Sequence, residues 1–387
     1  MPHLIPIEDF FRNPAKTRFQ ISPNGEFISF MAPWKNRLNV FTQKFGNTEI
    51  HQVTQETERN IAGYFWGSDN RILFLKDKGG DENYHLYSVS IEGNEERDLT
   101  PFEGITVQII DHLYENQDEV IIGMNQRNKE IFDAYRLNIH TGNLFREAEN
   151  PGNITDWITD HSGEIRIAIT TDGVNQSLLH RKSKDDLFQS VITTNFRESI
   201  SPLFFTFDNK NIYALSNIAR DKAAIVLFDL EKGIETEVLF THEEVDLESL
   251  LFSRKRKVLT SYSFTDWKRH ITFLDPEAEE IYSEIGKIIT DDEVVLTSQN
   301  KNETRFLVRS ISDRSLGAYY MYDVETKQLQ HLADVSDWLK KEELASMKPI
   351  SYLTEDGFKI HGYLTLPKNS EAKNLPVVVN PHGGPWV

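Results

Sequence analysis

The chain has 387 residues and a net charge of −18, from 42 basic and 60 acidic side chains. A surface this acidic repels phosphate backbones and anionic lipid, so neither nucleic acid nor a membrane is an expected partner. The chain contains no cysteine, which excludes disulfides and thiolate metal sites. It begins without a basic, apolar leader, and no apolar run approaches the ~20 residues of a membrane helix. We therefore expect a soluble, cytoplasmic protein.

Residues 1–18 are predicted to form a helical segment, centred on residues 7–16. From about residue 19, a pair of apolar strands recurs seven times at a spacing of about 46 residues. The first members of the pairs begin at Glu26, Arg71, Glu119, Glu164, Asn211, Lys257 and Arg305. The second members begin at Leu38, His85, Asp133, Ser177, Ala224, His270 and Ala318.

This repeat is typical of a β-propeller. Polar turns precede the first members, and a weaker, charged strand follows the second, so each unit is predicted to contain four antiparallel strands. Seven such units give a mainly β fold, a seven-bladed propeller over residues 19–339. A large β-sandwich is the alternative, but it does not require seven copies in register. The loops between the second and third strands are longer and more varied than the turns between the third and fourth, and they mark the candidate ligand or domain-docking face.

A second domain is predicted over residues 340–387. It is preceded by a short helix that starts at Asp337, with that aspartate as N-cap. Next comes a hairpin over residues 348–367, which turns at residues 355–357. The apolar run at residues 376–380 shows no alternation, which favours a strand in the interior of an α/β sheet. We predict that it is either a further strand of the same sheet or a disordered segment.

The hairpin, this apolar run and the turn Pro381-His-Gly-Gly-Pro resemble the start of the hydrolase domain in the prolyl oligopeptidase family of serine peptidases. The blades resemble bacterial members grouped with acylaminoacyl and dipeptidyl peptidases. The resemblance implies a propeller that caps its own C-terminal α/β-hydrolase domain and admits only short peptides. It implies no metal or organic cofactor.

The resemblance also assigns roles to residues. His382, Gly383 and Gly384 match the turn whose backbone N–H groups form an oxyanion hole. The serine, acid and base of the triad follow that turn in this fold, and no Gly-x-Ser-x-Gly motif occurs in the chain. We therefore expect the 387-residue chain to be an inactive front part of a serine peptidase. A free-standing binding propeller is the rival interpretation.

Smaller signals point to the loops. Asp77, Asp81 and Asn83 have calcium-like spacing but lack a full ligand run, which favours a simple turn. Paired acids such as Glu95-Glu96 and Asp291-Asp292 match the pattern that binds a peptide amino terminus in dipeptidyl peptidases, although a solvated rim explains most such pairs. Three loop-tip residues are candidates for substrate binding: Arg220, Trp267 and Arg314.

Overall fold

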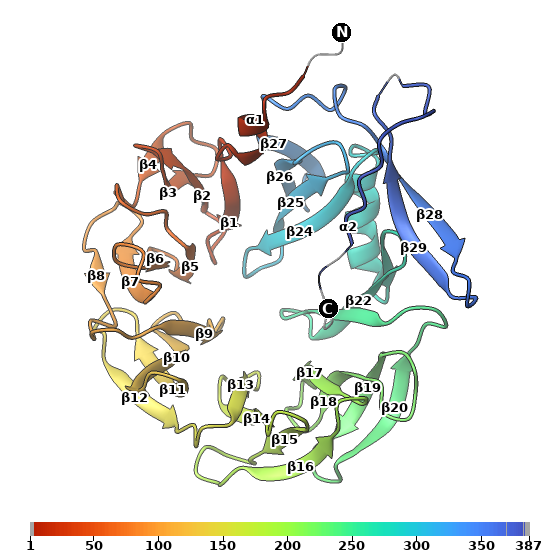
Figure 1. The fold of residues 1–387 in the computed structure, drawn as a ribbon. Coiled ribbons are helices and arrows are strands. Elements are labelled where there is room, and N and C mark those ends of the chain that lie inside the picture. Colours follow the sequence, from red (N-terminus) through yellow and green to blue (C-terminus); the bar gives the residue numbers. More distant parts are fainter. Residues whose placement is uncertain (1–3, 369, 382, 384–387) are drawn as a thin grey trace.

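The structure is a computed structural model that describes residues 4–368, 370–381 and 383. Within these residues, the strands form seven sheets arranged in a ring and one two-stranded sheet outside the ring (Figure 1). Each sheet of the ring consists of consecutive antiparallel strands, so the blades follow one another in chain order. The mainly β, seven-bladed propeller predicted from the repeat is confirmed.

The first four blades run as follows. Blade 1 contains β1 (Thr17–Ile21), β2 (Phe27–Trp34), β3 (Arg37–Lys44) and β4 (Ile50–Gln52). Blade 2 contains β5 (Gly63–Ser68), β6 (Arg71–Lys76), β7 (His85–Ser90) and β8 (Arg97–Asp98). Blade 3 contains β9 (Val107–Asp111), β10 (Glu119–Asn128), β11 (Ile131–Asn138) and β12 (Leu144–Ala148). Blade 4 contains β13 (Ile154–Thr159), β14 (Ile165–Thr171), β15 (Gln176–His180) and β16 (Gln189–Thr194).

The other three blades complete the ring. Blade 5 contains β17 (Ile200–Phe205), β18 (Ile212–Ser216), β19 (Ala224–Asp229) and β20 (Ile234–Phe240). Blade 6 contains β21 (Leu247–Ser253), β22 (Val258–Thr265) and β23 (Arg269–Phe273), followed by the helix α2 (Pro276–Gly286). Blade 7 contains β24 (Glu293–Gln299), β25 (Arg305–Ile311), β26 (Ala318–Asp323) and β27 (Gln328–Asp334).

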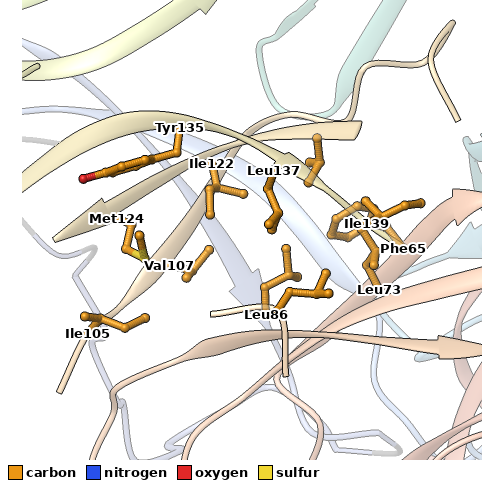
Figure 2. Close-up of a cluster of buried hydrophobic side chains, with 12 residues drawn as sticks. Phe65, Leu73, Leu86, Ile105, Val107, Ile122, Met124, Tyr135, Leu137 and Ile139 are labelled. Atoms are coloured by element: carbon orange, nitrogen blue, oxygen red, sulfur yellow. The ribbon is translucent and has the colours of Figure 1, made fainter. Parts of the chain in front are cut away.

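The recurring pair of the sequence forms the second and third strands of every blade, which lie in the middle of each sheet. Strand β6 shows why these strands are so apolar. Successive side chains of a strand point to opposite faces, and here both faces are covered by neighbouring blades. Ile72 and Phe74 pack toward blade 1, whereas Leu73 packs toward blade 3, and all three are fully buried. Figure 2 shows the second of these clusters, in which Leu73 lies among side chains of blades 2 and 3.

Blade 6 differs from the prediction of four strands. After β23 the chain forms α2, which takes the place of the fourth strand. Its N-cap Asp275 accepts a hydrogen bond from the Ala278 N–H at 3.0 Å, Pro276 occupies the first turn, and Ile281 and Ile285 are buried. The acidic cap, the early proline and the four-residue apolar spacing are helix signals that were present in the sequence. They were overlooked because the repeat predicted a fourth strand at this place.

Blades 7 and 1 close the ring without exchanging a strand. The Ile21 N–H donates to Ser298 Oγ at 3.1 Å, and the Lys301 N–H donates to the Pro23 carbonyl at 2.8 Å. The rings of Phe19 and Tyr319 lie 4.8 Å apart in a shared core. Side-chain packing and a few hydrogen bonds therefore join the two ends of the propeller.

The predicted helix starting at Asp337 is wrong, because residues 337–346 form bends and turns. The N-terminal helix α1 (Ile7–Phe11) is also shorter than the predicted stretch. Helix α1 and its flank contact residues 337–346. The Trp338 indole donates to the Asp9 carbonyl at 2.9 Å, and the Arg12 guanidinium lies over the Trp338 ring at 4.5 Å. A ten-residue helix is marginal on its own, and this contact fixes the segment in another conformation.

The hairpin beyond the ring is confirmed. Its strands β28 (Met347–Leu353) and β29 (Lys359–Thr365) pair antiparallel across the expected turn. Of the two predictions for residues 376–380, a further strand or a segment without regular structure, the strand is not formed, because these residues have no strand partner and Val378 is 91 % exposed. A fully buried strand needs neighbours on both sides. In the described part of the chain, that sheet contains β28 and β29 alone, and no α/β-hydrolase domain is seen.

Candidate functional site

The propeller has two unlike faces. One face, the loop face, carries the loops between the second and third strands of each blade, together with the connections between blades. The other face, the turn face, carries the turns between the first and second strands. Because the chain enters β1 and leaves β27 at the loop face, α1, residues 335–346 and the hairpin β28–β29 all lie on that side.

The hairpin is held by loops of blades 6 and 7. The Tyr363 hydroxyl on β29 donates to the Trp267 carbonyl in the β22–β23 loop. The Met347 N–H at the start of β28 donates to the Asp313 carboxylate in the β25–β26 loop at 2.6 Å. Figure 1 shows the hairpin beside α2 and β22, outside the ring. The loop face thus holds the first element of the predicted second domain.

Two of the three substrate-binding candidates lie at this junction. Trp267 supplies the carbonyl just described. The residue is 48 % exposed, and the Lys268 ammonium lies 4.7 Å from the centroid of its ring. Arg314 lines a cavity of about 190 Å³ together with Leu344, Leu364 and other residues at the base of the hairpin. The Arg314 Nε atom is buried and has no hydrogen-bond partner among the described residues. Both candidates are therefore next to the docked hairpin.

The third candidate, Arg220, lies apart from them in the β18–β19 loop of blade 5. Its guanidinium forms two contacts with the Glu235 carboxylate, at 2.5 and 3.1 Å, and donates to the Ser216 carbonyl at 3.1 Å. These bonds use most of its donors within its own blade. In the structure Arg220 braces a loop, and no described contact joins it to Trp267 or Arg314.

The acidic side chains of the loop with calcium-like spacing already have partners within the protein. Asp77 pairs with Arg59 at 3.2 Å, and the Asp81 carboxylate accepts hydrogen bonds from the backbone N–H groups of Lys78 and Asn83. The loop is therefore a turn stabilised by its own side chains. Among the described residues, no cluster of three or more histidine or acidic side chains is arranged to hold a metal ion.

Some paired acids anchor other parts of the chain. Glu95 pairs with Arg71 at 2.6 Å, and Glu96 pairs with Lys76 at 3.1 Å. Asp292 pairs with Lys341 at 2.7 Å, which ties residues 335–346 to blade 7. These carboxylates neutralise cations of the protein itself.

The turn face is bridged across the central channel. The β9–β10 turn of blade 3 reaches the turns of blades 6 and 7, which are not its neighbours in the ring. The Arg254 guanidinium lies 5.3 Å from the centroid of the Tyr114 ring, and the Lys301 ammonium lies 2.6 Å from the Glu115 carboxylate. Burial raises the pKa of Tyr114 to about 12, so the phenol is neutral at physiological pH. No sequence signal pointed to this bridge.

The predicted oxyanion turn falls largely outside the described residues. His382 and Gly384 are not among them, and Gly383 is described as an exposed residue without regular secondary structure. Their role stays a prediction.

No protein-family model matches the chain. Among curated proteins, it is 29 % identical to dipeptidyl aminopeptidase BIII of Pseudoxanthomonas mexicana, over 99 % of this chain and 57 % of the relative. It is 22 % identical to dipeptidyl peptidase family member 6 of Caenorhabditis elegans, over 94 % of this chain and 52 % of the relative. The resemblance to the prolyl oligopeptidase family is confirmed. The chain spans about half the length of the curated relatives it matches.

Solved structures agree on the fold of this prolyl oligopeptidase-like propeller. A prolyl endopeptidase matches with a TM-score of 0.65 at 10 % identity, over 93 % of this chain and 55 % of its own length. A puromycin hydrolase matches with a TM-score of 0.61 at 13 % identity, over 94 % of this chain and 61 % of its own length. Prolyl oligopeptidase B of Galerina marginata matches with a TM-score of 0.62 at 10 % identity, over 94 % of this chain and 57 % of its own length. Within the described part of the propeller chain, no helix is long and apolar enough to cross a membrane.

Proposed function

We propose that the chain is the substrate-gating propeller of a serine peptidase that hydrolyses short peptides, of the oligopeptidase, dipeptidyl or acylaminoacyl type. The observation that carries this proposal is the hairpin β28–β29 held on the loop face through Tyr363 and Met347. By resemblance, this hairpin opens the hydrolase domain, so its position indicates which face of the propeller that domain covers. The similarity to two dipeptidyl peptidases along nearly the whole chain supports the same conclusion.

The proposal divides the chain into a helical segment at residues 1–18, a propeller at residues 19–339 and the start of the hydrolase domain at residues 340–387. In the whole protein, a serine activated by a histidine would attack the scissile carbonyl and form an acyl-enzyme. Backbone N–H groups around Gly383 and Gly384 would stabilise the oxyanion. By the same resemblance, the triad would belong to the rest of the hydrolase domain, and the 387-residue chain alone would not catalyse the reaction. A cytoplasmic location stays a prediction from the sequence.

Gating follows from the two faces. The contacts of Tyr114 with Arg254 and of Glu115 with Lys301 cross the channel at the turn face, where they would hinder the entry of a peptide. A peptide would then reach the covered loop face from the side of the hydrolase domain, where Trp267 and Arg314 are placed to contact it. A folded protein is too large for that approach, whereas a short extended peptide is not.

The test compares three substrates that share one cleavable sequence. The whole protein is assayed with a fluorogenic dipeptide, the same dipeptide with an acetylated amino terminus, and a folded protein that carries the sequence in a surface loop. We expect hydrolysis of at least one short substrate and none of the folded protein. Equal cleavage of all three would refute gating, and no cleavage of any would favour a binding propeller. The 387-residue chain, which we expect to be inactive, is the control.

A further inference from the structure

The seam between blades 6 and 7 is packed differently from the other seams of the ring. At each other seam, the described side chains of the two facing sheets form a shared apolar cluster. At this seam the cluster joins Ile281 and Ile285 of α2 to Phe306, Val308 and Tyr322 of blade 7, and no residue of β21, β22 or β23 takes part. The helix fills the outer part of the seam and leaves space nearer the channel.

That space is a cavity of about 310 Å³, within the range of small-molecule sites. Leu251 and Phe252 line it from blade 6, Ile281 lines it from α2, and Val295 and Phe306 line it from blade 7. Leu251 is 45 % exposed although it lies in an inner strand. These walls suit an apolar group, and the hydroxyl groups of Ser261 and Thr297 add polar contacts.

Two arginines line the same cavity, and they differ in their partners. Arg256 is neutralised, since its terminal nitrogens lie 2.8 Å from the two oxygens of Asp275 and 3.4 Å from Glu277. Its buried Nε atom donates no hydrogen bond to any described residue, but it lies 4.0 Å from the Glu303 carboxylate. Arg269 forms no ion pair with any carboxylate in the described residues. Glu277 and Glu303 also line the cavity, and both carboxylates lie within 4.0 Å of Arg256. The acidic side chains of the cavity are therefore gathered around Arg256, and Arg269 is the lining cation that pairs with none of them, beside apolar walls.

We propose that this cavity binds a small carboxylate with an apolar body, about the size of one acylated amino acid. The guanidinium of Arg269 would pair with the carboxylate, because planar N–H donors match its two oxygens. The body would cover Leu251 and Phe252. This site lies in the seam of the propeller and its existence does not depend on the proposed peptidase function.

The test is calorimetric titration of the 387-residue chain with N-acetyl-phenylalanine and with N-acetyl-phenylalaninamide. The two ligands share one body and differ in the charge that Arg269 would recognise. We expect the acid to bind at one site and the amide to bind at least about tenfold more weakly, as for the loss of one charge-assisted pair. Equal binding of the two, or no saturable binding of the acid up to about 10 mM, overturns the proposal.

Variants localise the binding. Arg269→Gln should bring the acid to the affinity of the amide, whereas Arg197→Gln, which removes an exposed arginine that contacts Phe196, should leave both unchanged. Ala278→Leu fills the cavity from α2 and should abolish binding without lowering Tm. If Arg269→Gln binds the acid as tightly as the parent chain does, the ligand binds elsewhere and the proposed site is wrong. Because no turnover is measured, failure here does not affect the peptidase proposal.

Discussion

The Lys301 ammonium and the Glu115 carboxylate lie 2.6 Å apart, although they belong to blades 7 and 3 on opposite sides of the ring. Both side chains are substantially exposed, so the pair contributes at most about 1 kcal/mol to stability. Its importance is geometric. Together with the contact of Arg254 with Tyr114, it shows that the blade 3 turn reaches across the channel.

This relationship predicts a crosslink. A carbodiimide activates the Glu115 carboxylate, and the Lys301 amine displaces the urea to form an amide only when the two groups are in contact. We expect mass spectrometry to find this amide after digestion, and we expect it to disappear in Lys301→Arg. The pair Lys182–Glu231, 2.7 Å apart on neighbouring blades, is the positive control. A crosslink in the control without one between Glu115 and Lys301 would show that the channel is open at the turn face.

A second prediction concerns the core between blades 2 and 3. Leu73→Ala removes a fully buried side chain from the cluster in Figure 2 and should lower the free energy of unfolding by about 2–5 kcal/mol. Phe145→Ala removes a side chain that is 70 % exposed on the outer strand β12 and should change it by less than about 0.5 kcal/mol. Denaturant titration measures both, and similar losses would contradict the packing described.

These cores are the part that sequence reasoning predicted well, because a strand buried on both faces leaves a run such as Ile72-Leu-Phe74 at a constant spacing. The same regularity led to the wrong prediction of a fourth strand in blade 6. Asp275 and Pro276 are the N-cap and first residue of a helix there, but the repeat favoured a strand. The bridge from Tyr114 to Arg254 could not be predicted, since it depends on how blades distant in the chain meet. The fate of residues 376–380 likewise depends on sheet neighbours that the described chain does not provide.

A third prediction separates steric clash from backbone strain in the loop that holds Asp313 and Arg314. Gly317 has a φ of +85°, and a Cβ there would lie 1.6 Å from the Ser310 carbonyl oxygen. Gly173 has a φ of +93° with no atom within 4 Å of its Cβ position. We expect Gly317→Ala to lower Tm clearly more than Gly173→Ala, which bears only a strain of about 1–2 kcal/mol. Equal melting temperatures would mean that this loop adjusts freely.

A fourth prediction concerns pH. Burial, together with Arg166, lowers the pKa of His180 from 6.5 to about 4. Its neutral form is favoured in the folded state, so this stabilisation is present above pH 6.5 and is lost as the pH falls toward 4. Between pH 7 and pH 5 the loss is about 2 kcal/mol. His180→Gln should remove that part of the pH dependence in urea titrations, and a variant with the same pH profile as the parent would assign the effect to other groups.

The central claim is that this propeller belongs to a serine peptidase whose nucleophile lies outside the 387 residues. Labelling with a fluorophosphonate tests it most directly, because an activated serine forms a bond to phosphorus and expels fluoride. The whole protein and the 387-residue chain are treated side by side and analysed by intact mass. We predict stoichiometric labelling of the whole protein and none of the chain. Labelling of the 387-residue chain, or a whole protein that stays unlabelled, would contradict the account.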